Sequence, residues 1–415
     1  MLYAAVPLVL LRLYRLGARH PGYRQRWRQR FGFVPAVAGR PVWIHAVSVG
    51  EVQAAAPLIK RLRQRLPDAG ILVTTMTPTG ADVVQRSFGA AVTHVYLPYD
   101  LPDAVRRFLD RVRPRVLVLM ETELWPNLVE ACRRRSLPVI LANGRLSARS
   151  AASYRPLGRL IADLLRSIST IAAQTQADAD RFIGLGAMPA RVFVTGSVKF
   201  DMDLPADIVT RGEAARALLG PSRSVLLAAS THAGEEEIVL EAFRKVRERI
   251  EDTLLVLVPR HPERAQRLQM LCVQRGCTVV RRTDNPGSTE NVDVFLLDTL
   301  GELTVFYAAS DVAFVGGSLI PVGGHNPLEA AAVGIPILLG PHTFNFSAID
   351  QLLQTAGAVR RVNNAEELAM VAADLLIDPE LRMRMGDAGR QVVEANRGAA
   401  NQLTSLLEAV LGIAS

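Results

Sequence analysis

The sequence predicts an α/β protein with two Rossmann-like domains. The chain has 415 residues, which suits two domains better than one. From Pro41 onward, short uninterrupted apolar runs alternate with amphipathic segments, as in parallel sheets covered by helices on both faces. This alternation pauses at residues 196–205 and then starts again. We therefore expect an N-terminal domain over residues 36–204 and a C-terminal domain over residues 205–415, with the last helices, from about Pro379, packing back on the first domain.

The individual elements follow from apolar runs and helical spacing. In the first half, apolar residues at i, i+3, i+4, i+7 and i+10 predict a helix over 51–66, and a second helix is expected over 81–88. The strands expected in this half are 41–47, 71–76, 94–98, 115–120, 138–143 and 169–174. In the second half, a helix is expected from about residue 235, and the strands expected are 224–230, 253–259, 277–282, 293–298, 312–317 and 336–340. Ligands of such sheets bind beyond the carboxyl ends of the strands.

Charge and cysteine content exclude several classes of protein. The net charge is +8, yet the first 50 residues contain eight arginines and no acidic residue, so residues 51–415 balance at 40 basic and 40 acidic residues. We therefore expect no nucleic-acid partner, and an anionic partner for the N-terminal end alone. The three cysteines are too few for a disulfide framework and fit a reducing compartment.

The N-terminal end predicts attachment to a membrane surface. The apolar run over residues 3–10 is too short to cross a bilayer and has no signal-peptide cleavage site. On a helix, Tyr23, Trp27 and Phe31 would share one face, away from the arginines of this segment, Arg24, Arg26, Arg28 and Arg30. That pattern suits the headgroup region of an anionic leaflet on the cytoplasmic side. The alternative is that the three aromatic residues dock the helix on the protein's own core.

Two acidic loops follow strands of the first half. In HAVSVGE, Glu51 opens a helix; it complements the helix dipole, or it acts as a general base if burial or a second carboxylate opposes that dipole. In METELWPN, Glu121 and Glu123 follow a fully apolar strand and precede Trp125. They are either a functional pair or solvated loop residues.

Three further motifs carry basic residues or glycines. In GSVKFD, Lys199 would neutralise a phosphate or a sugar carboxylate, or it is an exposed linker lysine. In VPRHPER, Arg260 suits a phosphate because its planar guanidinium donates two parallel hydrogen bonds, while Arg264 fits a solvated helix. In the run from residue 316 to 340, glycines precede a helix beginning near Asn326. Backbone N–H groups there suit a phosphate and Glu329 suits ribose hydroxyls, although a tight packing turn is the alternative.

The remaining polar motifs support a polar cleft in the second half. Four of the seven histidines, His232, His261, His325 and His342, lie in loops of this half. The sequence contains no HExxH motif, no Cys/His set with zinc spacing and no DxD motif. We therefore expect a mechanism without a metal ion or other cofactor.

Six motifs in order, HAVSVGE, METELWPN, GSVKFD, VPRHPER, DTLGEL and GGHNPLE, together resemble the Kdo transferases of lipopolysaccharide assembly. Kdo is 3-deoxy-D-manno-octulosonic acid. The resemblance covers nearly the whole chain and includes the opening LYRLGARHPGYRQRWRQRFG. It implies a GT-B glycosyltransferase fold, in which two Rossmann-like domains face a central cleft. It also implies inverting, metal-free transfer of Kdo from CMP-Kdo to a lipid A precursor (lipid IVA), at the cytoplasmic face of the bacterial inner membrane.

The resemblance assigns roles to residues at matching positions. Glu51 resembles the family's base, and Glu121 and Lys199 resemble residues that stabilise the transition state. The positions that resemble the family's CMP-binding residues are Pro259, Arg260, Leu300, Gly301, Glu302, Asn326, Pro327, Leu328 and Glu329. The apolar N-terminus is short for the family's usual anchor, so we predict that residues 1–35 form a membrane-associated segment containing a helix.

Two other functions are compatible with such a chain. A GT-B-type sugar-nucleotide epimerase would need neither a lipid nor a basic amphipathic end. A non-catalytic, membrane-bound nucleotide-sugar-binding protein would not need the acids at Glu51 and Glu121.

Overall fold

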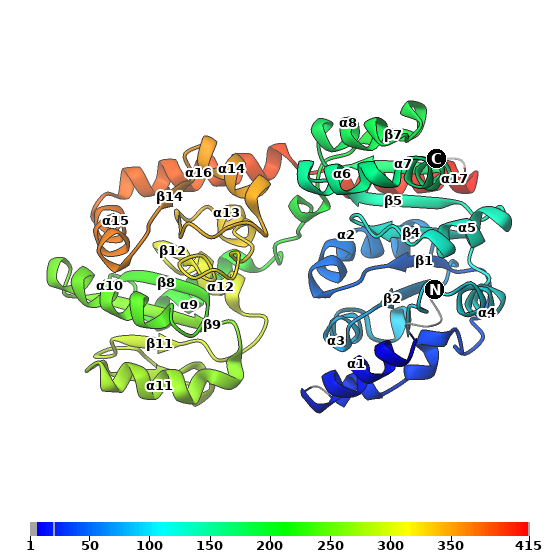
Figure 1. The fold of residues 1–415 in the computed structure, drawn as a ribbon. Helices are drawn as coiled ribbons and strands as arrows, with labels where there is room; N and C mark the ends of the chain where they lie inside the picture. The colour runs from blue at the N-terminus through cyan, green and yellow to red at the C-terminus, as the bar shows by residue number, and fades with distance from the viewer. Residues whose placement is uncertain (1–5, 20, 414–415) are drawn as a thin grey trace. The chain divides into compact units, whose positions relative to one another are not determined.

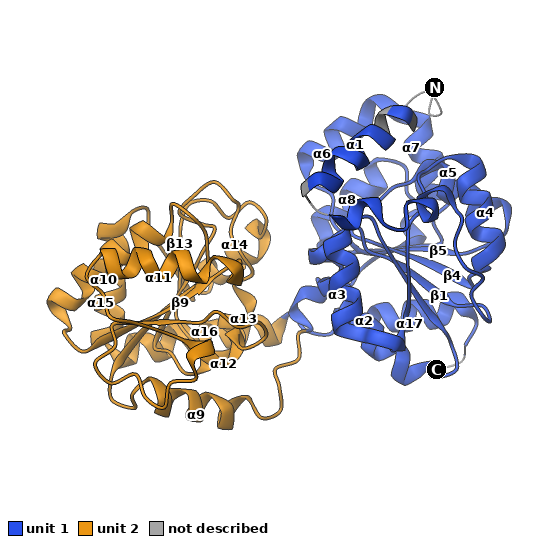
Figure 2. Ribbon diagram, turned by 90° about the horizontal axis from the view of Figure 1, so that it is seen from below, with its two compact units in different colours: residues 1–201, 396–415 blue, residues 202–395 orange. Residues whose placement is uncertain are grey.

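The structure is a computed structural model that describes residues 6–19 and 21–413. It divides into two compact units, shown in Figure 2. Unit 1 comprises the described parts of residues 1–201 and 396–415, and unit 2 comprises residues 202–395. The domain boundary predicted from the sequence, after residue 204, lies three residues beyond the boundary in the structure, which follows residue 201. Each unit is an α/β domain with a parallel sheet.

Unit 1 contains a seven-stranded parallel sheet in the order β3-β2-β1-β4-β5-β6-β7 among the described residues. Its strands are β1 (Val42–His45), β2 (Ile71–Thr75), β3 (Thr93–Tyr96), β4 (Val116–Met120), β5 (Val139–Gly144), β6 (Thr170–Ala173) and β7 (Val192–Val194). Its helices are α1 (Val6–Arg19), α2 (Val49–Arg65), α3 (Pro78–Phe88), α4 (Pro102–Val112), α5 (Pro126–Arg134), α6 (Ala148–Tyr154), α7 (Gly158–Arg166), α8 (Gln176–Gly184) and α17 (Ala399–Leu411). Helices α4 and α5 cover one face of the sheet, and α2, α3 and α17 cover the other (Figure 1).

Unit 2 repeats this plan, with strand order β10-β11-β9-β8-β12-β13-β14 over its described residues. Its strands are β8 (Ser224–Thr231), β9 (Thr253–Pro259), β10 (Val279–Arg281), β11 (Val294–Leu296), β12 (Val312–Val315), β13 (Ile337–Leu339) and β14 (Val359–Arg361). Its helices are α9 (Ile208–Leu219), α10 (Glu236–Arg249), α11 (Ala265–Gln274), α12 (Leu303–Ala308), α13 (Leu328–Val333), α14 (Ser347–Thr355), α15 (Ala365–Ile377) and α16 (Pro379–Ala395). In both units the strand order reverses beside the first strand, and this switch point is where ligands of such sheets bind.

The C-terminal helix returns to unit 1, whereas α16 stays in unit 2. Leu403 and Leu407 of α17 are buried in the same core as Leu58 and Ile59 of α2. Asp201, at the end of the first passage through unit 1, accepts hydrogen bonds at 2.6 Å from the backbone N–H groups of Gly398 and Ala400. The carboxylate therefore caps the start of α17, where the helix dipole favours a negative charge.

The segment after α1 differs from the expected helix. It forms two separate 3₁₀ turns, Pro21–Arg24 and Trp27–Phe31, because Arg26 between them adopts a left-handed conformation with φ of 50°. The prediction that Tyr23, Trp27 and Phe31 share one helical face is therefore wrong. The segment packs against the rest of unit 1 instead. The Phe31 ring lies edge-on to the Tyr99 ring, with centroids 5.6 Å apart.

The arginines of this segment also contact unit 1 rather than all pointing away from it. Arg30 is buried, its guanidinium lies over the Tyr96 ring at 4.4 Å, and it donates a hydrogen bond to the Met76 carbonyl. Arg26 lies over the same ring at 4.5 Å. Among the described residues, no helix is both long and apolar enough to cross a membrane. Residues 3–5 of the expected apolar run lie outside the described residues.

Candidate active site

Glu51 lies in the first turn of α2, directly beyond the carboxyl end of β1. Its side chain is only 8% exposed. The Val47 N–H donates a hydrogen bond to Oε2 at 2.8 Å, and the Ser48 hydroxyl donates to Oε1 at 3.2 Å. Burial raises the pKa of Glu51 from 4.5 to about 7, against these hydrogen bonds and with help from the charges of Glu121 and Glu123. A carboxylate with this pKa can accept a proton near neutral pH.

Glu121 lies at the carboxyl end of the adjacent strand β4. Its φ of 57° is in the left-handed region, which is unfavourable for a residue with a Cβ atom. The conformation is held in part by a hydrogen bond from its N–H to the Ala142 carbonyl of β5 at 2.9 Å. The Lys199 ammonium lies 3.1 Å from Glu121 Oε1. The structure thus brings Glu121 and Lys199, 78 positions apart in the chain, into one ion pair.

Two further polar side chains, His45 and Asn143, lie beside these residues, and the sequence did not predict a role for either. His45 at the end of β1 is fully buried, its Nδ1 contacts Thr74, and burial lowers its pKa to about 4, so it is neutral at pH 7. Its ring lies edge-on to Trp125, with centroids 6.3 Å apart. Asn143 of β5 is also fully buried. A polar residue at the end of an otherwise apolar strand is the signal that could have marked both.

Unit 2 contains the glycine-rich loop at the carboxyl end of β12. Buried Glu235 accepts backbone hydrogen bonds from Gly317, Ser318 and Leu319 at 2.7, 3.1 and 3.0 Å. Gly323 has a φ of 106°, and a Cβ atom there would lie 2.5 Å from the Phe344 ring. The loop is therefore fixed by a buried carboxylate and requires glycine at this position.

Three histidines and Arg260 lie beside this loop. His232 Nε2 and His325 Nε2 are 2.8 Å apart and their rings are stacked, and the His261 ring lies edge-on to His232. Burial, followed by the charge of Arg260, lowers the pKa of His325 to about 4. Arg260 is exposed at the end of β9. An exposed guanidinium beside the neutral His325 imidazole suits an anionic group.

The predicted CMP-binding residues in the loop after β11 and in α13 differ from one another in exposure and in charge. Leu300 and Gly301 are exposed in the loop after β11. Burial opposes ionisation of Glu302, but hydrogen bonds from Thr299 and Arg282 outweigh it and lower the pKa of Glu302. Burial raises the pKa of Glu329, whose Oε2 accepts a hydrogen bond from Thr304 at 3.0 Å.

The helix expected from Asn326 begins later. Helix α13 has six residues, Leu328–Val333, with Pro327 at its N-cap. The Asn326 side chain accepts a hydrogen bond from the Leu328 N–H at 3.2 Å, so one of the free N–H groups expected for a phosphate is occupied. The glycine-loop backbone and Arg260 are therefore stronger candidates for phosphate contacts than this helix end.

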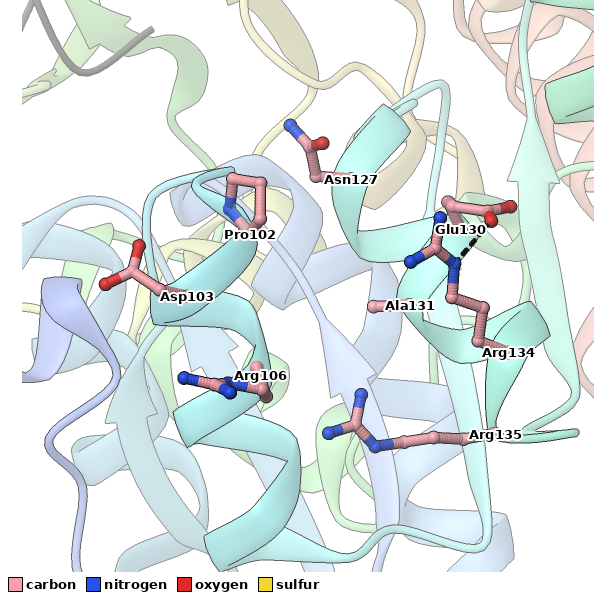
Figure 3. A pocket seen from close by; sticks show the side chains of 8 residues that line it. All are labelled: Pro102, Asp103, Arg106, Asn127, Glu130, Ala131, Arg134 and Arg135. Atoms are coloured by element: carbon pink, nitrogen blue, oxygen red, sulfur yellow. Dashed lines mark hydrogen bonds and ion pairs between the residues drawn. The ribbon is translucent and has the colours of Figure 1, made fainter.

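A groove of about 490 Å³ lies between α4 and α5 in unit 1 (Figure 3). Arg134 is paired with Glu130 at 2.7 Å, and Arg135 is paired with Asp110 at 2.6 Å. These acidic partners compensate two of the groove's arginines, and none of the predicted site residues lines it. Among residues 6–19 and 21–413, no three His, Cys, Asp or Glu side chains are grouped as ligands of a metal ion.

Comparison with known proteins identifies the family. Residues 25–202 match the family model described as 3-deoxy-D-manno-octulosonic-acid transferase (kdotransferase), and residues 235–392 match glycosyl transferases group 1. The chain is 41% identical to the 3-deoxy-D-manno-octulosonic acid transferase of Haemophilus influenzae, over 99% of this chain and 97% of that protein. The chain belongs to the Kdo transferase family. The enzyme of the same name from Bordetella pertussis is 39% identical over 98% of this chain and 97% of its own length.

Membership confirms the resemblance stated from the six motifs, and it makes the chain a glycosyltransferase. The fold is also found in a solved structure of a putative UDP-N-acetylglucosamine 2-epimerase from Listeria monocytogenes, with a TM-score of 0.57 over 91% of this chain and 98% of that chain. The two sequences are 18% identical, so this similarity shows the shared GT-B fold alone.

The raised pKa of Glu51 predicts a pH-dependent stability difference. Between pH 4.5 and about 7, Glu51 loses its proton in the unfolded chain but retains it in the folded chain, so the folded state loses stability as pH rises. Glu51→Gln removes this penalty. Its free energy of unfolding relative to the parent should rise by about 3 kcal/mol between pH 4.5 and pH 7.5, measured by urea unfolding. Exposed Glu241→Gln is the control. A Glu51→Gln difference that does not change with pH would contradict the burial argument.

Proposed function

We propose that this Kdo transferase moves Kdo from CMP-Kdo to a lipid A precursor (lipid IVA) in lipopolysaccharide biosynthesis. The observation that carries the proposal is Glu51, a buried carboxylate with a pKa of about 7 next to the Glu121–Lys199 ion pair. An acceptor hydroxyl needs such a base, because a free hydroxyl is a weak nucleophile at neutral pH.

The proposed reaction inverts the anomeric carbon in one displacement. Glu51 takes the proton of an acceptor hydroxyl as that oxygen bonds to the anomeric carbon of Kdo. The bond from this carbon to the phosphate oxygen breaks, and CMP leaves with the bonding electrons. Glu121 and Lys199 provide one negative and one positive charge beside the reacting groups, which suits a transition state with separated charge.

We propose that unit 2 binds the CMP part of the donor through Pro259, Arg260, Leu300, Gly301, Glu302, Asn326, Pro327, Leu328 and Glu329. Exposed Arg260 would pair with the phosphate. Glu302 is favoured as an anion and would accept hydrogen bonds from ribose hydroxyls. Because exposed Arg260 provides positive charge for the phosphate, the proposed mechanism uses no metal ion and no other cofactor.

The epimerase alternative receives support only from the shared fold, whereas family membership supports transfer. A non-catalytic nucleotide-sugar-binding protein would need neither the buried Glu51 nor the Glu121–Lys199 ion pair.

Glu51→Gln is expected to lower kcat by about 100- to 10,000-fold while leaving CMP binding within a factor of about two, because the base acts only in the chemical step. Turnover is measured by mass spectrometry of the lipid product with CMP-Kdo and a tetraacylated lipid A precursor, with EDTA present. Glu241→Gln is the control for the substitution itself. Unchanged turnover in Glu51→Gln would remove Glu51 from the mechanism, and loss of transfer in EDTA by the parent would contradict the metal-free proposal.

We further propose that the N-terminal end rests on the cytoplasmic face of the inner membrane. Pro7, Leu10, Leu11 and Tyr14 of α1 are exposed at i, i+3, i+4 and i+7, and exposed Arg12 and Arg15 lie on the same helix. An exposed apolar stripe next to arginines suits an anionic leaflet. The enzyme would bind a lipid acceptor at this same membrane surface.

Replacing Leu10 and Leu11 together by serine should weaken binding to vesicles containing phosphatidylglycerol by roughly tenfold, because two leucine side chains no longer enter the interface. Cosedimentation measures this. Replacing the exposed leucines Leu157 and Leu160 by serine is the matched control and should leave binding unchanged. Equal binding by both double variants would contradict attachment through α1.

A further inference from the structure

Asn143 lies next to Glu121 at the carboxyl edge of the first sheet. It is fully buried near the end of β5, and its φ is 55°. Met120 is paired in register with Ala142, and the Glu121 N–H donates to the Ala142 carbonyl at 2.9 Å. The backbone of β5 that leads into Asn143 is therefore directly connected to the backbone of Glu121.

The Asn143 side chain reaches a distant part of the chain. Its Oδ1 accepts a hydrogen bond from the Val198 N–H at 3.2 Å. Its own carbonyl accepts a hydrogen bond from the Gln174 side chain at 3.0 Å, which fixes the strand end on the other side. Val198 begins the 3₁₀ turn Val198–Phe200 that contains Lys199. The Asn143 amide thus connects β5 to the residue immediately before Lys199.

The short turn is held at both ends. Asn143 holds Val198 at its start, and Asp201, directly after its end, is bound to the N-terminus of α17. Lys199 lies between these two attachments, with its ammonium 3.1 Å from Glu121. Ala142, directly before Asn143, accepts the hydrogen bond from the Glu121 N–H, so two consecutive residues of β5 contact the two segments that carry the ion pair.

We propose that Asn143 is a positioning residue whose side-chain amide holds Lys199 against Glu121. Its importance for turnover rests on the proposed function above. Asn143 lies outside the six motifs that resemble the Kdo transferases.

The consequence of losing this contact follows from charge. Lys199 compensates the negative charge of Glu121, and Glu121 in turn acts on Glu51. If Lys199 moves away, the uncompensated carboxylate disfavours ionisation of Glu51, so the base remains protonated up to a higher pH. A loss of general packing would lower activity without moving this pH dependence.

Asn143→Gly tests the proposal, because glycine accepts the left-handed φ and removes only the side chain. Its kcat should fall about 10- to 100-fold with the KM for CMP-Kdo within about twofold, and the acidic limb of its pH–rate profile should move to higher pH. Asn291→Gly is the matched control: Asn291 is exposed, has a φ of 62° and lies in unit 2. It should behave as the parent does.

A double-mutant cycle with Lys199→Met separates positioning from structure. If Asn143 acts through Lys199, the variant with both changes should be no slower than Lys199→Met alone. Rate losses that multiply, or a parent-like kcat in Asn143→Gly, would overturn the inference while leaving the proposed function intact. Absence of Kdo transfer by the parent would instead refute the proposed function.

Amide hydrogen exchange gives a readout independent of activity. The Val198 N–H should exchange faster in Asn143→Gly, whereas the Thr195 N–H, which donates to the Ala173 carbonyl, should not change. Asn143→Asp is a second variant for the case that the glycine variant does not fold. It retains an acceptor oxygen and tolerates the left-handed φ, so Val198 should remain protected. Loss of that protection in a folded Asn143→Asp protein would overturn the proposal.

Discussion

The chemistry proposed for unit 1 depends on a buried carboxylate, Glu51, that lies near two other carboxylates. Glu51 accepts hydrogen bonds from the Val47 N–H and the Ser48 hydroxyl, which favour its charged form. Burial disfavours the charged form more strongly. The balance places its pKa near neutrality. Without Lys199, Glu121 would add an uncompensated negative charge to the same region. Burial accounts for the largest part of the shift in the Glu51 pKa, and the charges of Glu121 and Glu123 add to it.

The fold explains why these groups meet. The parallel register of β1, β4 and β5 brings the ends of the strands to one edge, so Glu51, Glu121 and Asn143 follow from three neighbouring strands. Lys199 arrives from beyond β7, through a turn tied to β5 on one side and to α17 on the other. The C-terminal helix thus helps to fix a residue of the candidate active site although nearly two hundred residues separate them.

The central strands were predictable because buried parallel strands are continuous apolar runs. β7 and β14 were missed, since Phe193 and Val194 are exposed and β14 contains Arg360 and Arg361. The aromatic spacing after α1 could not reveal the left-handed Arg26 that breaks the helix. Acids after apolar strands indicated the candidate site, and the motif resemblance suggested the roles proposed for them. Asn143 and Glu235 form hydrogen bonds between segments that are distant in the chain, and no spacing in the sequence shows such contacts.

The pH dependence of kcat/KM is the decisive measurement for Glu51, because it reports the ionisation of the base in the free enzyme. If Glu51 is the base, the profile has an acidic limb with an apparent pKa of about 7, and Glu51→Gln loses this limb together with most of the rate. A limb near pH 4.5, the ordinary value for a glutamate, or a limb that persists unchanged in Glu51→Gln, would contradict the assignment of a buried Glu51 as the base.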